Sequence, residues 1–313
     1  MSKTKVFIDG SSGTAGLKIH DRIAARGDIE LIEAPHEKHR DKNTRRDAIN
    51  AADIAFLCLP DEGSIESAGL VESENVVVID TSTAHRTAPG WEYGFPELSG
   101  RREKIAASKR IANPGCHASG FIALTQPLVE AGIIPKTLGL SCFSLTGYSG
   151  GGKKMIAQYE DENREVRLSS PRLYGTGQNH KHLREMTLIP GLSVPPIFCP
   201  VVADYYSGME TVVTLFAKDI SGSAENIKAV YRELYSGKVV RYAENAGEDG
   251  FAAAGGYSGR DDMEIAVFGN EERIVLTARF DNLGKGASGA AIQNMNIVIG
   301  ADETEGLVLG GAE

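Results

Sequence analysis

The sequence lacks any long uninterrupted apolar run. No segment of the 313-residue chain approaches the about 20 consecutive apolar residues that a helix needs to cross a bilayer. The N-terminal stretch reaches glycine too soon for the apolar core of a secretion signal. We therefore expect a cytoplasmic protein that has no membrane partner.

Cysteine and an excess of positive charge are also missing. The 4 cysteines lie far apart with no CxxC pair, which argues against a zinc finger and against a disulfide framework. The 33 Lys and Arg residues are outnumbered by 42 Asp and Glu residues, for a formal net charge of -9. This balance gives no sign of a basic surface for nucleic acid, so no nucleic-acid partner is expected.

The chain does have a cysteine in a tight turn. Pro114 and Gly115 directly precede Cys116, and apolar positions with helical spacing follow over residues 121–129. With a short apolar run at 105–107 before it, this pattern predicts a strand–turn–helix junction. Exposed N–H groups and the helix dipole would favour the thiolate there. Cys116 is therefore a candidate nucleophile, and the alternative is a buried cysteine that packs as a small apolar residue.

A glycine-rich loop near the N-terminus has the context of a dinucleotide site. A strand is predicted over residues 5–9 and a helix over 17–25, and the loop between them reads GxxGxxG rather than GxGxxG. Such a loop lets the backbone approach a pyrophosphate at a helix N-terminus; the alternative is a simple tight turn. The candidate cofactor-binding residues here are Gly10, Ser12, Gly13, Thr14, Ala15 and Gly16.

The next predicted strand, over residues 29–34, is followed by basic residues. An acidic residue at its end would bind the ribose 2′-hydroxyl of NAD. Lys38 and Arg40 follow instead, with the pair at 45–46 soon after, and this cluster could meet a 2′-phosphate. NADP is therefore favoured over NAD, with Glu33 weakening the preference; a solvated charged loop is the alternative.

Strands and helices alternate in the first part of the chain. Further strands are predicted over 52–60 and 76–80, with a helix over 64–71 between them. This alternation predicts an α/β fold, a Rossmann-like doubly wound parallel sheet. Polar residues at the carboxyl ends of its strands would line the ligand crevice.

The pattern changes after Cys116, where strands cluster and helices are few. The predicted strands are 137–144, 197–202, 209–217, 264–269 and 273–281, the last two forming a hairpin, with a helix over 224–235. This pattern predicts an α+β domain with a largely antiparallel sheet, a kind of surface often used for dimer contacts. The glycine-rich segment 282–300 is predicted to become a helix and return to the first domain. We expect residues 1–115 together with 285–313 to form the dinucleotide-binding domain, and 116–284 the catalytic and dimerisation domain.

Two polar stretches could contribute to a site. The loop over 146–154 is rich in glycine and closes on two lysines, so it could bind an anion through backbone N–H groups and charge; a flexible surface loop is the alternative. The stretch 174–185 contains His180 and His182, either of which could act as general base and acid. They could equally be exposed residues opening a helix, where their side chains would point apart. No third ligand is evident, so no metal site is expected.

Several of these pieces together resemble one family, the short-chain (type 2) class of N-acetyl-gamma-glutamyl-phosphate reductases. They run through nearly the whole chain. The matching segments are Asn113-Pro114-Gly115-Cys116, Asp80 to Arg86, Tyr93 to Leu98, Ser149 to Lys153 and the tail Asp281 to Asn296.

The resemblance implies a semialdehyde dehydrogenase-like fold and an arginine-biosynthesis enzyme that uses NADPH to reduce an acyl phosphate. It places the nucleophile on Cys116 and the acid–base histidine on His180 or His182, with Glu185 nearby. It also implies cofactor contacts at Gly150 and Asn294. The residues assigned to substrate and phosphate are Arg86, Ser149, Gly151 and Lys153. The expected partners are a small acyl phosphate and further copies of the chain, as a dimer or tetramer.

In the implied reaction, the Cys116 thiolate displaces phosphate from N-acetyl-gamma-glutamyl phosphate and leaves a thioester. Hydride from NADPH then yields N-acetylglutamate 5-semialdehyde. The nearest alternative is aspartate-semialdehyde dehydrogenase, which has the same cysteine turn and a shorter substrate. A nucleotide-binding regulator without catalysis is a further alternative, motivated by the atypical glycine spacing.

Overall fold

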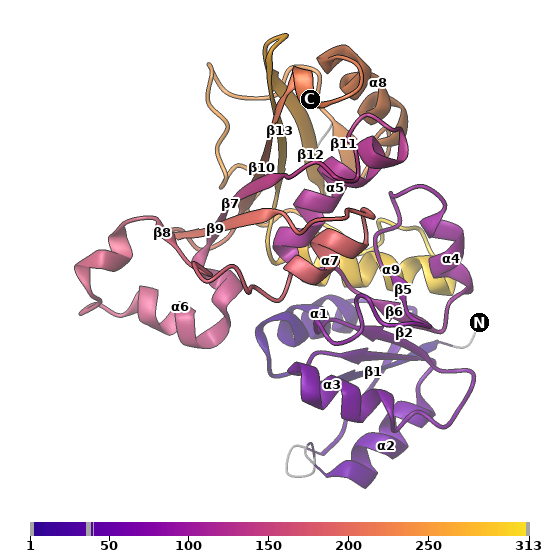
Figure 1. Ribbon diagram of the computed structural model, residues 1–313. Coiled ribbons are helices and arrows are strands. Elements are labelled where there is room, and N and C mark those ends of the chain that lie inside the picture. Colours follow the sequence, from indigo (N-terminus) through magenta and orange to yellow (C-terminus); the bar gives the residue numbers. More distant parts are fainter. Residues whose placement is uncertain (1–2, 36–38, 40, 311–313) are drawn as a thin grey trace. The chain divides into compact units, whose positions relative to one another are not determined.

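The computed structural model describes residues 3–35, 39 and 41–310 (Figure 1). Within this described chain there are two compact units. The first contains residues as far as Pro96, then Gly100–Gly115 and Ala287–Leu307; the second contains Glu97–Ser99, Cys116–Gly286 and the residues from Val308 onward. Of the helices in the described chain, none has the length and apolarity needed to cross a bilayer.

The first unit is built on a six-stranded parallel sheet with the strand order β2-β1-β3-β4-β6-β5. Its elements are β1 (Thr4–Asp9), α1 (Thr14–Ala24), β2 (Ile29–Ile32), α2 (Lys42–Ala51), β3 (Ile54–Leu57), α3 (Asp61–Ala68), β4 (Val77–Asp80), β5 (Glu92–Tyr93), α4 (Arg101–Ala107), β6 (Arg110–Ala112) and α9 (Gly289–Ile299).

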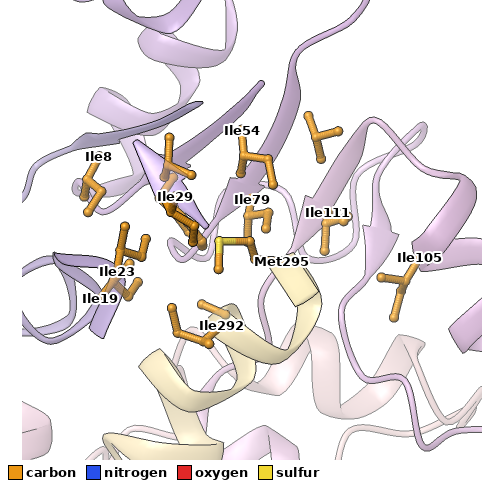
Figure 2. Close-up of a cluster of buried hydrophobic side chains, with 14 residues drawn as sticks. Ile8, Ile19, Ile23, Ile29, Ile54, Ile79, Ile105, Ile111, Ile292 and Met295 are labelled. Atoms are coloured by element: carbon orange, nitrogen blue, oxygen red, sulfur yellow. The ribbon is translucent and has the colours of Figure 1, made fainter. Parts of the chain in front are cut away.

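Both faces of this sheet are covered by helices. Because side chains alternate along a strand, Val6 and Ile8 of β1 join one core while Phe7 joins the other. The first core also receives side chains from α1, α4 and α9, among them Ile19 and Met295, as Figure 2 shows. The second core receives side chains from α2 and α3. The sheet is therefore doubly wound, as the alternation of strands and helices predicts.

Two local expectations were wrong. The apolar run at 105–107 is the end of helix α4, and the strand that leads into the cysteine turn is β6. The charged segment expected as a loop after β2 contains helix α2, whose first turn is capped by Asp41 accepting from the backbone N–H of Thr44 at 2.8 Å. In both places a single buried isoleucine, Ile105 or Ile49, is enough to anchor a short polar helix.

The second unit is built on a seven-stranded sheet with the order β11-β12-β13-β10-β7-β9-β8. Its elements are α5 (Cys116–Glu130), β7 (Ser141–Gly147), α6 (Gly152–Glu160), β8 (Arg172–Leu173), α7 (Leu183–Leu188), β9 (Ile197–Ala203), β10 (Met209–Phe216), α8 (Ala224–Leu234), β11 (Val240–Tyr242), β12 (Met263–Gly269) and β13 (Arg273–Phe280). Short 3₁₀ turns lie at Tyr148–Gly151, Val166–Ser169 and Ala217–Asp219, and a π-helical turn at Gly284–Ser288.

This sheet is mixed, with antiparallel pairings in the majority. Four of its strand pairings are antiparallel, and the pairings β11–β12 and β7–β9 are parallel. Helix α5 is buried on all sides over 117–129. Helix α8 is fastened to it, since the hydroxyls of Tyr231 and Tyr235 donate to the carbonyls of Leu124 and Ala123 at 2.5 and 2.7 Å.

Large apolar side chains remain exposed on one face of this sheet. Phe143 of β7, Ile197 of β9 and Phe216 of β10 are 46%, 62% and 56% exposed. The neighbours Cys142, Phe198 and Leu215 point the opposite way and are buried. The sheet therefore has one face in the core and one apolar face in solvent, an arrangement typical of an association surface.

Candidate active site

Cys116 is the first residue of α5, directly after the turn that leaves β6. The turn is held in place within the first unit: the backbone N–H of Asn113 donates to the carbonyl of Asp80 at 2.7 Å. Cys116 itself is only half-buried. By contrast, burial raises the pKa of Cys142, which is fully buried, far above its usual range. Cys116 thus has the helix N-terminal position and partial exposure expected of a reactive thiol.

Three histidines of the second unit gather near the start of α5. The rings of His180 and His182 have centroids 4.7 Å apart, and each lies within 6 Å of His117, at 5.9 and 5.8 Å. His180 and His182 lie in the turn before α7, not within a helix, which is why residues two apart can come together. Their rings therefore lie close together, unlike those of residues two apart on a helix.

His117 is held between two hydroxyl groups. Its Nδ1 lies 2.7 Å from the Ser144 hydroxyl, and its Nε2 lies 2.6 Å from the Tyr174 hydroxyl. The Ser144 hydroxyl is in turn 3.1 Å from that of Thr211. Burial, and secondly the charge of His180, lower the pKa of His117 to about 3. His117 is therefore neutral at physiological pH.

The remaining candidate of this cluster, Glu185, lies in the first turn of α7 and is 2% exposed. Helix α7 begins directly after His182, whose carbonyl accepts the backbone N–H of Met186 at 3.0 Å. The segment that carries both histidines is therefore fixed to the helix that carries Glu185. The structure brings these three candidates into one region of the second unit.

The glycine-rich loop after β7 is ordered, not a flexible surface loop. Ser149 is 1% exposed and its hydroxyl accepts from the side chain of Asn282 at 3.0 Å, which leaves its own hydrogen available to a ligand. Gly150 is exposed, and Gly151 is the residue before α6, whose N-terminus has no side-chain cap. Lys153 is exposed in the first turn of that helix. A helix N-terminus with a nearby lysine and hydroxyl can hold an anion.

The first unit contains a separate cavity of about 490 Å³ at the carboxyl end of β1. It is lined by Gly10, Ser11 and Ser12 and by Glu33 beyond the end of β2. Gly10 has a φ of +88°, and a Cβ there or at Gly16 would collide with backbone carbonyls of Cys58 and Gly10. The loop is therefore shaped as a backbone cradle before α1, and Gly13, Thr14 and Ala15 form the start of that helix.

The basic residues expected to meet a 2′-phosphate are only partly accounted for. Lys38 and Arg40 lie outside the described residues. Arg45 lines the cavity but is already engaged by Asp9 at 3.0 Å and by Glu66 at 2.8 Å. Its charge is therefore neutralised, and it holds α2 and α3 against β1, so the expectation of Arg45 as a phosphate ligand was wrong.

Asn294 of α9 is fully buried in the first unit. Its side-chain nitrogen donates to the Gly94 carbonyl at 2.9 Å and to the side-chain oxygen of Asn113 at 3.2 Å. Its own side-chain oxygen is buried with no hydrogen-bond partner among the described residues. Because an unpaired buried acceptor is costly, this atom is suited to a ligand that supplies an N–H group.

Arg86 is 8% exposed and supports the chain next to the cysteine turn. Its guanidinium donates to the carbonyl of Asn113 at 2.9 Å and to that of Thr81 at 3.1 Å. The same motif places His85 2.6 Å from the carboxylate of Asp80. Arg86 thus stabilises the backbone around Asn113 and Thr81 in the first unit.

Sequence reasoning did not single out His117 or Tyr174. Both have features in the sequence that could have drawn attention to them. His117 directly follows the candidate nucleophile, and Tyr174 opens the stretch that contains the other two histidines. Nothing in the sequence indicates a role for Ser144 or Thr211, because buried hydroxyls on neighbouring strands are common.

Two family models match the chain. The model for the semialdehyde dehydrogenase NAD binding domain matches residues 4–108, and that for the semialdehyde dehydrogenase dimerisation domain matches residues 116–282. Among curated proteins, N-acetyl-gamma-glutamyl-phosphate reductases from Brucella ovis and Brucella melitensis are each 46% identical over 309 residues, covering 95% of this chain and 99% of the relative.

The chain belongs to the N-acetyl-gamma-glutamyl-phosphate reductase family. Solved structures place this family's fold among the semialdehyde dehydrogenases. Aspartate semialdehyde dehydrogenase II from Vibrio cholerae has a TM-score of 0.70 at 17% identity, over 96% of this chain and 99% of that one. The Candida albicans enzyme, solved with NADP, has a TM-score of 0.64 at 14% identity, over 95% and 99%. The predicted fold class, a Rossmann-like parallel sheet with a second, mixed sheet, is confirmed.

Proposed function

We propose that this protein catalyses the NADPH-dependent reduction of N-acetyl-gamma-glutamyl phosphate to N-acetylglutamate 5-semialdehyde and phosphate, a step of arginine biosynthesis. The observation that carries the proposal is a half-buried cysteine at a helix N-terminus beside a histidine cluster, in a chain 46% identical to reductases of that name. The geometry supports acyl transfer to sulfur.

In the proposed mechanism, the Cys116 thiolate attacks the acyl carbon of the substrate. A carbon–sulfur bond forms, the carbon–oxygen bond to phosphate breaks, and phosphate leaves with the electron pair. When bound, NADPH would supply the hydride that reduces the thioester carbon. The N–H groups at the start of α5 stabilise the oxyanion that results. Collapse of this adduct releases the aldehyde and returns the sulfur as thiolate.

We assign to His182 the proton that the Cys116 thiol loses when the attacking thiolate forms, and to His180 a donor role. The Nδ1 atom of His180 accepts the backbone N–H of His182 at 3.2 Å, so a neutral His180 carries its proton on Nε2. In that state His180 can donate a hydrogen bond but cannot accept a proton at Nε2. His182 is therefore the better acid and base, with Glu185 as the carboxylate that supports this segment.

The leaving phosphate is assigned to the loop before α6. Ser149 has a hydroxyl hydrogen available, and Gly151 and Lys153 stand at an uncapped helix start. Together they offer hydrogen-bond donors and a positive charge to a dianion. Arg86 keeps its assignment to the substrate in this proposal, in addition to its bonds to backbone.

The cavity in the first unit fits a dinucleotide. Gly10, Ser12, Gly13, Thr14, Ala15 and Gly16 would hold the pyrophosphate at the start of α1. The unpaired oxygen of Asn294 suits an amide donor such as that of nicotinamide, and Gly150 keeps its assignment to the cofactor. The choice of NADPH over NADH follows the relatives and the basic segment after β2.

The proposal extends to domains, assembly and location. Residues 1–115 with 285–313 are proposed as the cofactor domain and 116–284 as the catalytic and dimerisation domain. We also propose that the exposed apolar face formed by Phe143, Ile197 and Phe216 packs against a second copy of the chain, giving a dimer or tetramer. The predicted cytoplasmic location is kept.

Phosphate-dependent oxidation of two semialdehydes tests the proposed function in the reverse direction. The purified protein is given N-acetylglutamate 5-semialdehyde or aspartate semialdehyde with phosphate and NADP, and NADPH formation is followed. We expect turnover with the first at a kcat/KM at least about 100-fold above the second. The reverse preference would replace the proposal by an aspartate-semialdehyde dehydrogenase, and no turnover with either would refute a reductase.

A further inference from the structure

A line of four buried or half-buried groups crosses the second unit and includes His117, the residue that follows Cys116 in the chain. Thr211 of β10, Ser144 of β7, His117 of α5 and Tyr174 after β8 are joined by contacts of 3.1, 2.7 and 2.6 Å. Thr211, Ser144 and His117 are each at most 2% exposed. Each hydroxyl, and a neutral imidazole, has one hydrogen to donate, so the chain must be polarised in one of two directions.

Only one direction of hydrogen-bond donation along this line gives the Thr211 hydroxyl hydrogen an acceptor. Its hydroxyl has one hydrogen-bond contact among the described residues, which is Ser144. If Ser144 donated to Thr211, the Thr211 hydrogen would be buried with no acceptor in the described chain, and such groups are rare and costly. Thr211 therefore donates to Ser144.

The remaining polarity follows step by step. Ser144 has then accepted one bond and gives its single hydrogen to His117 Nδ1. Because burial lowers the pKa of His117 to about 3, its ring is neutral and carries its one proton on Nε2. That N–H donates to the Tyr174 oxygen at 2.6 Å. The Tyr174 hydrogen must then point away from His117.

Cys116 is the charged group on which the orientation of this hydroxyl acts. Tyr174 has no other hydrogen-bond contact among the described residues. Its pKa is raised, first by burial and then by the charge of Cys116, so the phenol stays protonated and lies within electrostatic reach of the sulfur. Cys116 is also the chain neighbour of His117.

We infer that Tyr174 is a positioning residue whose hydroxyl dipole, oriented by the buried line Thr211–Ser144–His117, stabilises the Cys116 thiolate. No proton is transferred along this line. The oriented hydroxyl dipole stabilises the thiolate without adding a charge. This inference deepens the proposed function and rests on Cys116 as its nucleophile.

Packing holds Tyr174 in place for this task. Tyr174 packs in a small apolar cluster with Tyr159 and Met155 of α6 and Val202 of β9. The guanidinium of Arg172 donates to the Tyr159 hydroxyl at 2.8 Å, which ties α6 to the strand that leads to Tyr174. The ionisable side chains around this end of α5 include Tyr174, His117, His180 and His182, whose rings contact one another, and Glu185 in the first turn of α7.

The test is the rate at which iodoacetamide alkylates Cys116, measured against pH by mass spectrometry of the peptide that carries it. Tyr174→Phe is expected to slow alkylation at pH 7 about tenfold, with the pH midpoint of the profile moved upward and the rate at high pH unchanged. Tyr148→Phe is the matched control, since Tyr148 packs in the same cluster without contacting His117. An unchanged profile in Tyr174→Phe would overturn the inference.

Variants far from the sulfur test the direction of the line. Thr211→Val removes the first donor, and we expect the midpoint to move the same way as in Tyr174→Phe, by a smaller amount. Thr214→Val on the same strand, exposed on the other face, should change nothing. Thr211→Val combined with Tyr174→Phe should equal Tyr174→Phe alone; additive effects would overturn the directional claim.

Ser144→Ala gives a second route if Thr211→Val fails to fold, and it should shift the profile as well. Alkylation requires neither substrate nor cofactor. A protein that shows the predicted shifts but no turnover would leave this inference standing and remove the proposed reaction. Normal turnover together with unshifted alkylation profiles in the variants would overturn this inference and leave the proposed reaction standing.

Discussion

The Nδ1 atom of His180 accepts a hydrogen bond from the backbone N–H of His182. This local bond fixes the tautomer of His180 and gives the two histidines different chemistry. It is possible because the segment is a turn before α7, in which residues two apart face each other. A helical H-x-H pair would have had no such bond.

His182→Asn is expected to lower kcat by about 10²–10⁴-fold, the usual worth of a general acid or base. It should also remove the acidic limb of the pH–rate profile. His180→Asn should lower kcat less, by about tenfold, and should leave that limb in place, because it removes a hydrogen-bond donor only. Steady-state kinetics from pH 5 to 9 compare the two variants. Loss of the acidic limb in His180→Asn, with that limb retained in His182→Asn, would reverse the assignment.

The buried His117 should make stability depend on pH. Its pKa is lowered to about 3 in the fold, while an unfolded histidine titrates near about 6.5. Below that value the unfolded chain binds the proton and the folded chain does not, so the stabilising contribution present above pH 6.5 is lost as the pH falls toward 3.

The measurement is the free energy of unfolding by urea between pH 4 and 7. Wild-type protein should lose stability with falling pH more steeply than His117→Gln, by up to about 1.4 kcal/mol per pH unit. Parallel curves for the two proteins would mean that His117 is charged in the fold or that its burial is relieved.

Lys285 and Glu97 form a buried ion pair within the second unit. The Lys285 nitrogen lies 2.9 and 2.8 Å from the two carboxylate oxygens of Glu97, and the side chains are 2% and 8% exposed. Lys285→Met alone should cost about 3–5 kcal/mol of unfolding free energy, because it removes the cation that balances the buried carboxylate of Glu97. Adding Glu97→Leu should recover most of that loss.

The matched control for this prediction is Glu165→Gln, which breaks the exposed pair of Glu165 with Arg167. It should cost less than about 1 kcal/mol, as exposed pairs do. Chemical denaturation of the wild-type protein and of the three variants gives the comparison. Equal losses for Lys285→Met and Glu165→Gln would show that the buried pair is not desolvated in solution.

Asn294→Ala is expected to weaken NADPH binding about tenfold, since a buried hydrogen-bond acceptor for the cofactor is lost. Gln293→Ala is the control, because the neighbouring Gln293 is occupied with Glu303 on the same helix. NADPH fluorescence on binding reports the dissociation constant. Unchanged affinity in Asn294→Ala, with an unchanged melting temperature, would remove Asn294 from the cofactor site.

Local pattern in the sequence was enough to predict much of the fold. Glycine spacing after β1 and apolar spacing after Cys116 identified α1 and α5, because each signal lies within one element. Helices α2 and α4 were missed because they are short and polar and depend on one buried isoleucine each. Their stability comes from tertiary packing, which periodicity does not report.

The candidate site was predictable only in part, for a related reason. The cysteine turn and the H-x-H stretch are contiguous in sequence, so their chemistry could be inferred directly. The line from Thr211 to Tyr174 joins residues from three elements and the segment after β8, and the pairing of β7 with β10 brings Ser144 opposite Thr211. Nothing in the sequence specifies that register, so neither the line nor its polarity could be predicted.

The most direct test of the central claim is to trap the acyl group on the sulfur. The protein is mixed with N-acetyl-gamma-glutamyl phosphate without NADPH, quenched in acid and examined by mass spectrometry. We predict one N-acetylglutamyl group on the peptide that carries Cys116, its disappearance when NADPH is added, and none in Cys116→Ser, whereas Cys199→Ser behaves as wild type. Full reductase turnover in Cys116→Ser, or an acyl group carried by another residue, would contradict the account.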